Sequence, residues 1–255
     1  MSKNSEADST AIVFTNHNYA LTRSVVAFAD ALGTAAASSS SDSTATSFLS
    51  RLKAATDRVS PRMNRIGSMC QINARWFSDS IAMSVTFDDT KSLIDLLENL
   101  AYVQAGYAMN GIFLRGAVTV GLHCHSDYID YGPALTEAVH LEKTFAGAAT
   151  RIVLSPGLQQ DVRAFGTKRL PIVEDLSDHA YFLNFLGALD RVARTALRSQ
   201  IEMNYGDAQK SGNTRVLEKL AWLASYFNWC ARPSKPLEYA LDRGFRQLPW
   251  SRGVI

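Results

Sequence analysis

Short apolar runs alternate with amphipathic stretches along this chain, a pattern that predicts strands and helices following one another. The apolar runs predict strands at residues 24–31, 69–77, 80–87, 112–121, 151–155, 170–174 and 179–185. Apolar residues at helical spacing predict helices that start near residues 48, 90, 133 and 156. From about residue 186 the pattern is helical, with an apolar stripe at Val216, Leu217, Leu220, Leu223 and Tyr226.

Turn and capping residues indicate where the predicted elements in the middle of the chain begin and end. Only Ser78-Asp79 separates two extended runs, which predicts a hairpin with a tight turn. The next helix has three N-cap candidates and ends at Asn110-Gly111; the candidates are Asp88, Asp89 and Thr90. The helix that Pro133 opens is expected to run to residue 146.

A stretch rich in Ser and Ala, residues 35–47, predicts a mobile loop. The loop is followed by a short amphipathic helix, whose expected apolar face is Phe48, Leu49, Leu52 and Ala55.

The order of these elements predicts an α+β fold of ferredoxin-like type, in which two helices cover one face of a mainly antiparallel sheet. We expect a disordered tail at residues 1–10, a catalytic domain at residues 11–185 and a C-terminal helical extension at residues 186–255.

Composition excludes several classes of protein. No apolar run approaches the roughly 20 residues of a membrane helix, and a net charge of +2 does not favour nucleic acid or an anionic membrane. The polar start and three widely spaced cysteines are typical of a cytoplasmic protein. We interpret His123-Cys124-His125 as an ordinary strand segment and not as a metal cluster, because adjacent strand residues point to opposite faces.

Two aspartates are candidate metal ligands. Asp30 ends an apolar strand, and Asp79 lies in the hairpin turn. Each alone is typical of a turn or cap, but neighbouring strands would bring both carboxylates to one sheet edge. Two carboxylates held together suit one or two Mg²⁺ or Mn²⁺ ions. The turn that follows Asp30 offers backbone N–H groups to phosphate, and Arg115 is either a paired strand residue or a phosphate ligand.

Four segments, in this order and spacing, resemble the class III nucleotide cyclases, and most closely the bacterial pyrimidine nucleotide cyclases of Pycsar anti-phage systems. They are VVAFADALG (25–33), WFSDSIAMS (76–84), LRGAVTVG (114–121) and YGPALTEAVHLE (131–142). The resemblance covers about residues 24–185.

The resemblance implies a catalytic domain of the class III cyclase fold and a homodimer with composite active sites. Asp30 and Asp79 fall on the two metal-binding positions of the family, and Arg115 falls on a phosphate-contacting arginine. The family's triphosphate-cradling turn falls on Ala31, Leu32, Gly33 and Thr34.

The chain departs from the purine cyclases at four positions. Thr136 and His140 replace the asparagine and arginine that steady the transition state, and are either catalytic or plain helix-surface residues. Arg75 and Ile129 replace the residues that select a purine base. Ile129 offers no hydrogen bond, whereas Arg75 is a donor that suits carbonyl oxygens unless it is only an exposed strand residue.

The resemblance, together with Arg75 and Ile129, implies a uridylate cyclase that converts UTP to 3′,5′-cyclic UMP and pyrophosphate with two Mn²⁺ or Mg²⁺ ions per site. The resemblance implies that the product is a second messenger in anti-phage defence, sensed by a separate effector protein. A cytidylate cyclase acting on CTP and a catalytically silent nucleotide-binding homologue remain alternatives.

Overall fold

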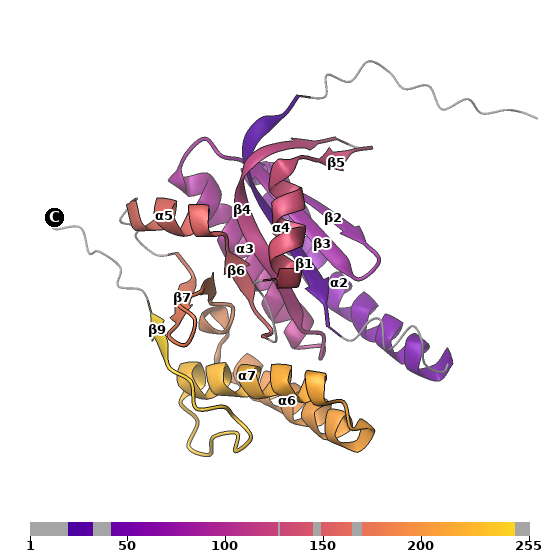
Figure 1. Cartoon of the computed structure of the whole chain (residues 1–255). Coiled ribbons are helices and arrows are strands. Elements are labelled where there is room, and N and C mark those ends of the chain that lie inside the picture. The colour runs from indigo at the N-terminus through magenta and orange to yellow at the C-terminus, as the bar shows by residue number, and fades with distance from the viewer. Residues whose placement is uncertain (1–19, 33–41, 127, 145–148, 165–169, 248–255) are drawn as a thin grey trace, which may run out of the picture.

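The computed structural model describes residues 20–32, 42–126, 128–144, 149–164 and 170–247 (Figure 1). Nine strands in these ranges form one sheet, in the order β2-β3-β1-β4-β6-β8-β7-β9, with β5 paired to β4. The strands are β1 (Thr22–Ala31), β2 (Asn73–Phe77), β3 (Ser80–Thr86), β4 (Leu114–His125), β5 (Asp130–Tyr131), β6 (Ile152–Leu154), β7 (Ile172–Asp175), β8 (Tyr181–Leu183) and β9 (Phe245–Gln247). The helices are α2 (Asp42–Cys70), α3 (Thr90–Ala108), α4 (Pro133–Thr144), α5 (Pro156–Ala164), η1 (Leu186–Ala188), α6 (Arg191–Ser211) and α7 (Thr214–Ala231).

The first six elements, β1-α2-β2-β3-α3-β4, form the core of the fold. Their strands lie in the order β2-β3-β1-β4, and each neighbouring pair is antiparallel. This is the ferredoxin-like arrangement, so the predicted α+β fold is confirmed. After α4 the chain adds β6 parallel to β4, and the remaining strands extend that edge of the sheet.

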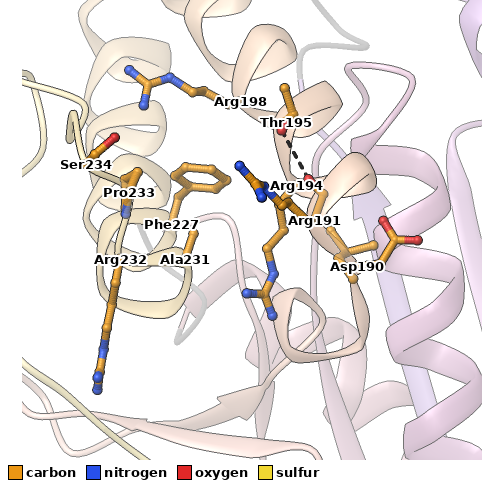
Figure 2. Close-up of a pocket in the computed structure, with 11 residues that line it drawn as sticks. Asp190, Arg191, Arg194, Thr195, Arg198, Phe227, Ala231, Arg232, Pro233 and Ser234 are labelled. Carbon is orange, nitrogen blue, oxygen red and sulfur yellow. Dashed lines mark hydrogen bonds between the residues drawn. The ribbon is translucent and has the colours of Figure 1, made fainter.

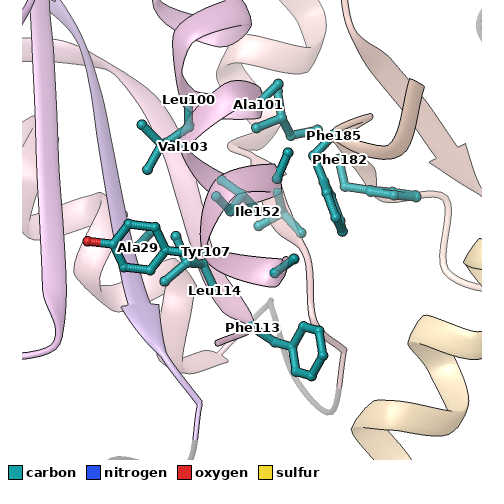
Figure 3. Packing of buried hydrophobic residues seen from close by; sticks show 14 of the residues in the cluster. Ala29, Leu100, Ala101, Val103, Tyr107, Phe113, Leu114, Ile152, Phe182 and Phe185 are labelled. Atoms are coloured by element: carbon teal, nitrogen blue, oxygen red, sulfur yellow. The ribbon is translucent and has the colours of Figure 1, made fainter. Parts of the chain in front are cut away.

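Helices lie on both faces of the sheet. Helices α2 and α3 lie behind it in Figure 1, and α4 crosses in front of it. The alternation of β1 fits this arrangement, because Val25, Ala27 and Ala29 belong to the main apolar core while Asp30 faces the other way. Figure 3 shows that core between α3 and the sheet, where Leu100, Val103 and Tyr107 approach Ala29, Leu114 and Ile152.

Helix α2 is longer than the sequence pattern indicated. Residues 42–47 form its first turns instead of a loop, and residues 69–70 are helical instead of extended; residues 33–41 lie outside the described ranges. Its buried positions recur at helical spacing through a polar segment, at Phe48, Ala55, Val59 and Met63. Leu49, expected on this apolar face, is 63% exposed, because it directly follows Phe48 and lies off the buried stripe.

The C-terminal segment is helical at first, as expected, with η1 followed by α6 and α7. It then returns to the sheet as β9, which pairs with β7 and was not indicated by the sequence. Edge-to-face aromatic contacts join helix and sheet, with ring centroids of Phe182 at 5.3 Å from Trp222 and 5.0 Å from Tyr226. Across the described ranges, no helix is both long enough and apolar enough to span a membrane.

Candidate active site

Asp30 and Asp79 meet where β1 ends beside the β2–β3 turn. The backbone N–H of Ala31 donates to the carbonyl oxygen of Asp79 at 3.1 Å, and this bond joins the two segments. Ser80 lies opposite Asp30 in the β1–β3 register, and its hydroxyl donates to Asp30 Oδ1 at 2.9 Å. The turn is tight, with Ser78 at φ 56°. The structure therefore brings together the two carboxylates that the sequence singled out.

The electrostatics of Asp30 fit a cation site. Burial raises the pKa of the Asp30 carboxyl, and the negative charge of Asp79 raises it further. The hydrogen bond from Ser80 and the charge of Arg115 act in the opposite direction without cancelling the rise. A carboxylate whose ionised form is disfavoured by burial and by a neighbouring carboxylate favours a nearby cation, and an all-oxygen ligand set suits Mg²⁺ or Mn²⁺.

Arg115 of β4 lies directly opposite Asp30 of β1 in the strand register. Its Nε is 2.6 Å from Oε1 of Glu142, a residue of α4 whose side chain is only 3% exposed. Burial, together with the charge of Asp30, raises the pKa of Glu142, while Arg115 and Lys219 lower it. Arg115 is thus a paired strand arginine that borders the aspartate pair, and in this structure its partner is a carboxylate.

Lys219 of α7 joins the same cluster, and sequence reasoning did not identify it. Burial lowers the pKa of its ammonium group, as does the neighbouring charge of Arg115, whereas Glu142 and Asp30 raise it. The helical extension therefore contributes a cation beside the carboxylates. The signal in the sequence was weak, because Lys219 lies next to Leu220 at the margin of an apolar stripe and resembles a solvated lysine.

The predicted phosphate-cradling turn is only partly described. The N–H of Ala31 is used by the bond to Asp79, and the N–H of Leu32 donates to the carbonyl oxygen of Phe113 at 2.9 Å. These two N–H groups bond the end of β1 to neighbouring segments and do not point to an open phosphate site. Gly33 and Thr34, the other half of the predicted cradle, lie outside the described residues.

Arg75 and Ile129 meet at the turn between β4 and β5. The Arg75 guanidinium donates through Nη2 to the carbonyl oxygen of Ser126. The N–H of Ile129 donates to the Ser126 hydroxyl at 3.0 Å, and Ile129 is 41% exposed. The structure thus brings the two predicted base-selecting residues to one turn.

Thr136 and His140 lie one turn apart on α4, and both are exposed. The Thr136 hydroxyl donates to the carbonyl oxygen of Gly132 at 3.2 Å, within the first turn of the helix. Both side chains are therefore on the open side of α4, where another molecule can reach them.

His123-Cys124-His125 is part of strand β4, as interpreted from the sequence. His123 and His125 are two positions apart and share one face of that strand. Asp130 of β5 lies opposite His125 in the register. The three side chains form a cluster whose ligand atoms all lie within 4.8 Å of one another.

A cavity of about 730 Å³ lies in the helical extension, between α6 and α7. Figure 2 shows Arg191 and Arg194 of α6 facing Phe227 of α7 across it, with Arg198 and Arg232 at its margins. None of the site residues predicted from the sequence lines this cavity, so it is separate from the aspartate pair.

No protein-family model and no curated protein sequence matches this chain. Among solved structures, the adenylyl cyclase CyaB from P. aeruginosa is similar with a TM-score of 0.46 and 14% identity, over 64% of this chain and 94% of that chain. The monomeric guanylyl cyclase domain of the RhoGC fusion protein from the aquatic fungus Blastocladiella emersonii is similar with a TM-score of 0.42 and 14% identity, over 65% of this chain and 95% of that chain. Similarities of this degree assign neither family nor activity.

Proposed function

We propose that this protein is a metal-dependent nucleotide cyclase of the class III type that converts UTP to 3′,5′-cyclic UMP and pyrophosphate. The observation that carries the proposal is the meeting of Asp30 and Asp79 at the end of β1, with the Ala31 N–H bonded to the Asp79 carbonyl oxygen. The motifs around both aspartates resemble the metal-binding motifs of that family.

In this reaction the ribose 3′-oxygen forms a bond to the α-phosphorus, and the bond from that phosphorus to the β-phosphate oxygen breaks. Pyrophosphate leaves, and the proton of the 3′-hydroxyl passes to solvent. Two Mg²⁺ or Mn²⁺ ions, when bound, would lower the pKa of the 3′-hydroxyl and neutralise the negative charge that develops on pyrophosphate.

Asp30 and Asp79 would hold these ions with their carboxylate oxygens, and Ser80 would keep the Asp30 side chain oriented. The basic residues Arg115 and Lys219 border the pair and would attract a triphosphate. Binding of the triphosphate offers Arg115 an anionic partner in addition to Glu142.

By the same resemblance, we propose that two copies of the chain form composite sites. Thr136 and His140 of α4 are exposed, so a second copy can reach their side chains. A head-to-tail pair of chains would join the aspartates of one copy to Arg75, Ile129, Thr136 and His140 of the other.

The deciding experiment is to incubate the purified protein with each of the four nucleoside triphosphates and Mn²⁺, and to identify products by mass. Cyclic UMP as the main product supports the proposal, and cyclic CMP would instead identify a cytidylate cyclase. A folded protein that binds nucleotide but forms no cyclic product would overturn the enzymatic proposal. By the same resemblance, we propose that the product is a second messenger in anti-phage defence, acting in the cytoplasm on a separate effector protein.

A further inference from the structure

We infer that the β4–β5 hairpin holds a transition-metal ion of the zinc class, with His123, His125 and Asp130 as its ligands. The inference does not rest on the proposed cyclase activity, although Asp130 directly follows Ile129; along β4 the site lies at the opposite end from Arg115. The register between β4 and β5 brings the three ligands together. His123 and His125 share a face of β4, and Asp130 lies directly across from His125, so the three side chains project to one side of the hairpin.

The atoms of this cluster are poorly explained as a hydrogen-bonded group. His123 Nε2 lies 2.8 Å from Asp130 Oδ1, and His125 Nδ1 lies 3.6 Å from Asp130 Oδ2. Within the described residues, none of four buried atoms makes a hydrogen bond of acceptable geometry: both ring nitrogens of His123, His125 Nδ1 and Asp130 Oδ1. The His123 side chain is only 2% exposed, so water does not easily satisfy it. Buried polar atoms whose contacts lack hydrogen-bond geometry are costly, and a shared cation would ligate both histidines and the carboxylate together.

The ligand types select the metal. Two imidazole nitrogens and one carboxylate oxygen suit Zn²⁺, Co²⁺ or Ni²⁺, whereas Mg²⁺ prefers oxygen ligands alone. Two histidines and one carboxylate leave at least one coordination position for water, as in zinc sites with three protein ligands. Cys124 points to the opposite face of β4 and is not a ligand.

The backbone of the hairpin is held closely in place. Gly132 follows β5 with φ +155°, and a Cβ atom there would lie 2.4 Å from the carbonyl oxygen of Leu122 and 2.7 Å from the Cα of His123. Only glycine permits this approach, which fixes β5 against β4 and sets the distance between the two sets of ligands.

The test uses the full-length protein without a histidine tag, stripped with a chelator and then dialysed. Titration with Zn²⁺ alone, followed by calorimetry, should show one saturable site per chain. Zn²⁺ at about 100 times its Kd should raise the Tm by about 5 °C or more. Co²⁺ in place of Zn²⁺ should give visible absorption bands of a nitrogen- and oxygen-ligated ion.

Variants then locate the site. His125→Gln and Asp130→Asn should each weaken Zn²⁺ binding by at least about 100-fold, the upper end of the effect of outer-shell partners. His179→Gln is the matched control, because His179 also lies 3.0 Å from a carboxylate, Glu174, but lacks a second histidine beside it. It should bind Zn²⁺ like the wild type.

Thermal unfolding without metal checks that each variant is folded. The absence of saturable Zn²⁺ binding by the folded wild type would overturn the inference and leave an ordinary His–Asp contact. Unchanged binding by both ligand variants, or loss of binding by His179→Gln, would overturn it as well. If the ligand variants do not fold, the wild-type Co²⁺ spectrum and the stoichiometry decide.

Discussion

The backbone N–H of Ala31 is bonded to the carbonyl oxygen of Asp79 at 3.1 Å, and this bond holds the residue after one aspartate against the other aspartate. The hairpin turn is therefore fixed to the end of β1, and the two carboxylates are held together before any cation binds. Preorganised ligands bind a cation without the cost of ordering them first.

Replacing either aspartate should abolish cyclisation while the protein stays folded. Burial and Asp79 raise the pKa of Asp30 in the folded state, so its ionised form costs stability at any pH above the unfolded value of about 3.9. Asp30→Asn should therefore leave the Tm at pH 7 unchanged or slightly raised without metal. Product formation and thermal unfolding measure both effects for Asp30→Asn and Asp79→Asn. The exposed Asp88→Asn is the control, and near-wild-type activity in either site variant would disprove the metal assignment.

Mixing two inactive variants should restore activity if the sites are composite. One variant is Asp79→Ala, and the other carries Arg75→Ala with Thr136→Ala. A hybrid dimer would contain one intact site and one doubly broken site. Random exchange makes about half of the dimers hybrids, so activity should reach up to about a quarter of the wild type. No recovery after demonstrated subunit exchange would place each site within one chain.

Arg75 should set the preference among nucleotides. It donates to the carbonyl oxygen of Ser126 beside Ile129, so its guanidinium is fixed at the β4–β5 turn. An unmatched polar contact in a desolvated site costs about 1–3 kcal/mol. We expect kcat/KM for UTP to exceed that for ATP or GTP at least about tenfold, with CTP the closest competitor. Arg75→Ala should reduce the ratio of kcat/KM for UTP to that for CTP by a larger factor than it reduces turnover of the better remaining substrate. If the kcat/KM ratios do not change, other residues select the base.

Lys219 should contribute to triphosphate binding although it belongs to the C-terminal helices. Lys219→Gln removes the positive charge beside Arg115, Glu142 and Asp30. A charge-assisted contact contributes about 1.5–3 kcal/mol, so kcat/KM should fall about tenfold or more, mostly through KM. Lys210→Gln on the exposed surface of α6 is the matched control and should leave both constants unchanged. Equal kinetics for the two variants would remove Lys219 from the site.

Asp175 should be the main electrostatic contact that holds the C-terminal segment. Its Oδ2 accepts hydrogen bonds from Trp222 Nε1 at 2.9 Å, Arg243 Nη1 at 3.0 Å and Arg151 Nη1 at 3.1 Å, and its side chain is fully buried. Asp175→Asn should cost roughly 3–5 kcal/mol of unfolding free energy, as expected for a broken buried ion pair. Asp178→Asn, at a side chain that is 42% exposed, should cost much less.

The pH dependence of that loss follows from the pKa of Asp175. Burial opposes its ionisation, but bonds from Ser177 and Trp222 and the charge of Arg151 outweigh burial and place its pKa below the usual value. The stability it contributes is therefore present above the unfolded pKa of about 3.9 and is lost as the pH falls through the folded value. Denaturant unfolding should be measured for wild type and Asp175→Asn from pH 7 to pH 3. The difference between their free energies of unfolding should decrease only below about pH 4. A constant difference across that range would mean that Asp175 acts through packing.

The sequence alone determined the elements that depend on local patterns. A continuous apolar run at residues 24–31 predicted β1, and the two-residue Ser78-Asp79 turn predicted the hairpin. Asp89 was correctly identified as an N-cap candidate, since its side chain accepts from the N–H of Ser92 at 2.8 Å. These signals are local, because strand alternation, turn geometry and helix capping involve residues only a few positions apart. The ferredoxin-like order followed from the succession of those elements.

Only the tertiary structure decided which distant residues meet. Lys219 lies near Asp30 because α7 packs back against the end of the sheet, and Asp130 lies near His125 because β5 pairs with β4. Strand β9 forms because it pairs with β7, some seventy positions earlier in the chain. The sequence of β7 does not indicate which distant segment will pair with it. Such contacts depend on how separate segments pack and on the register between their strands. The hydrophobic periodicity of one segment predicts its own secondary structure but not its partner.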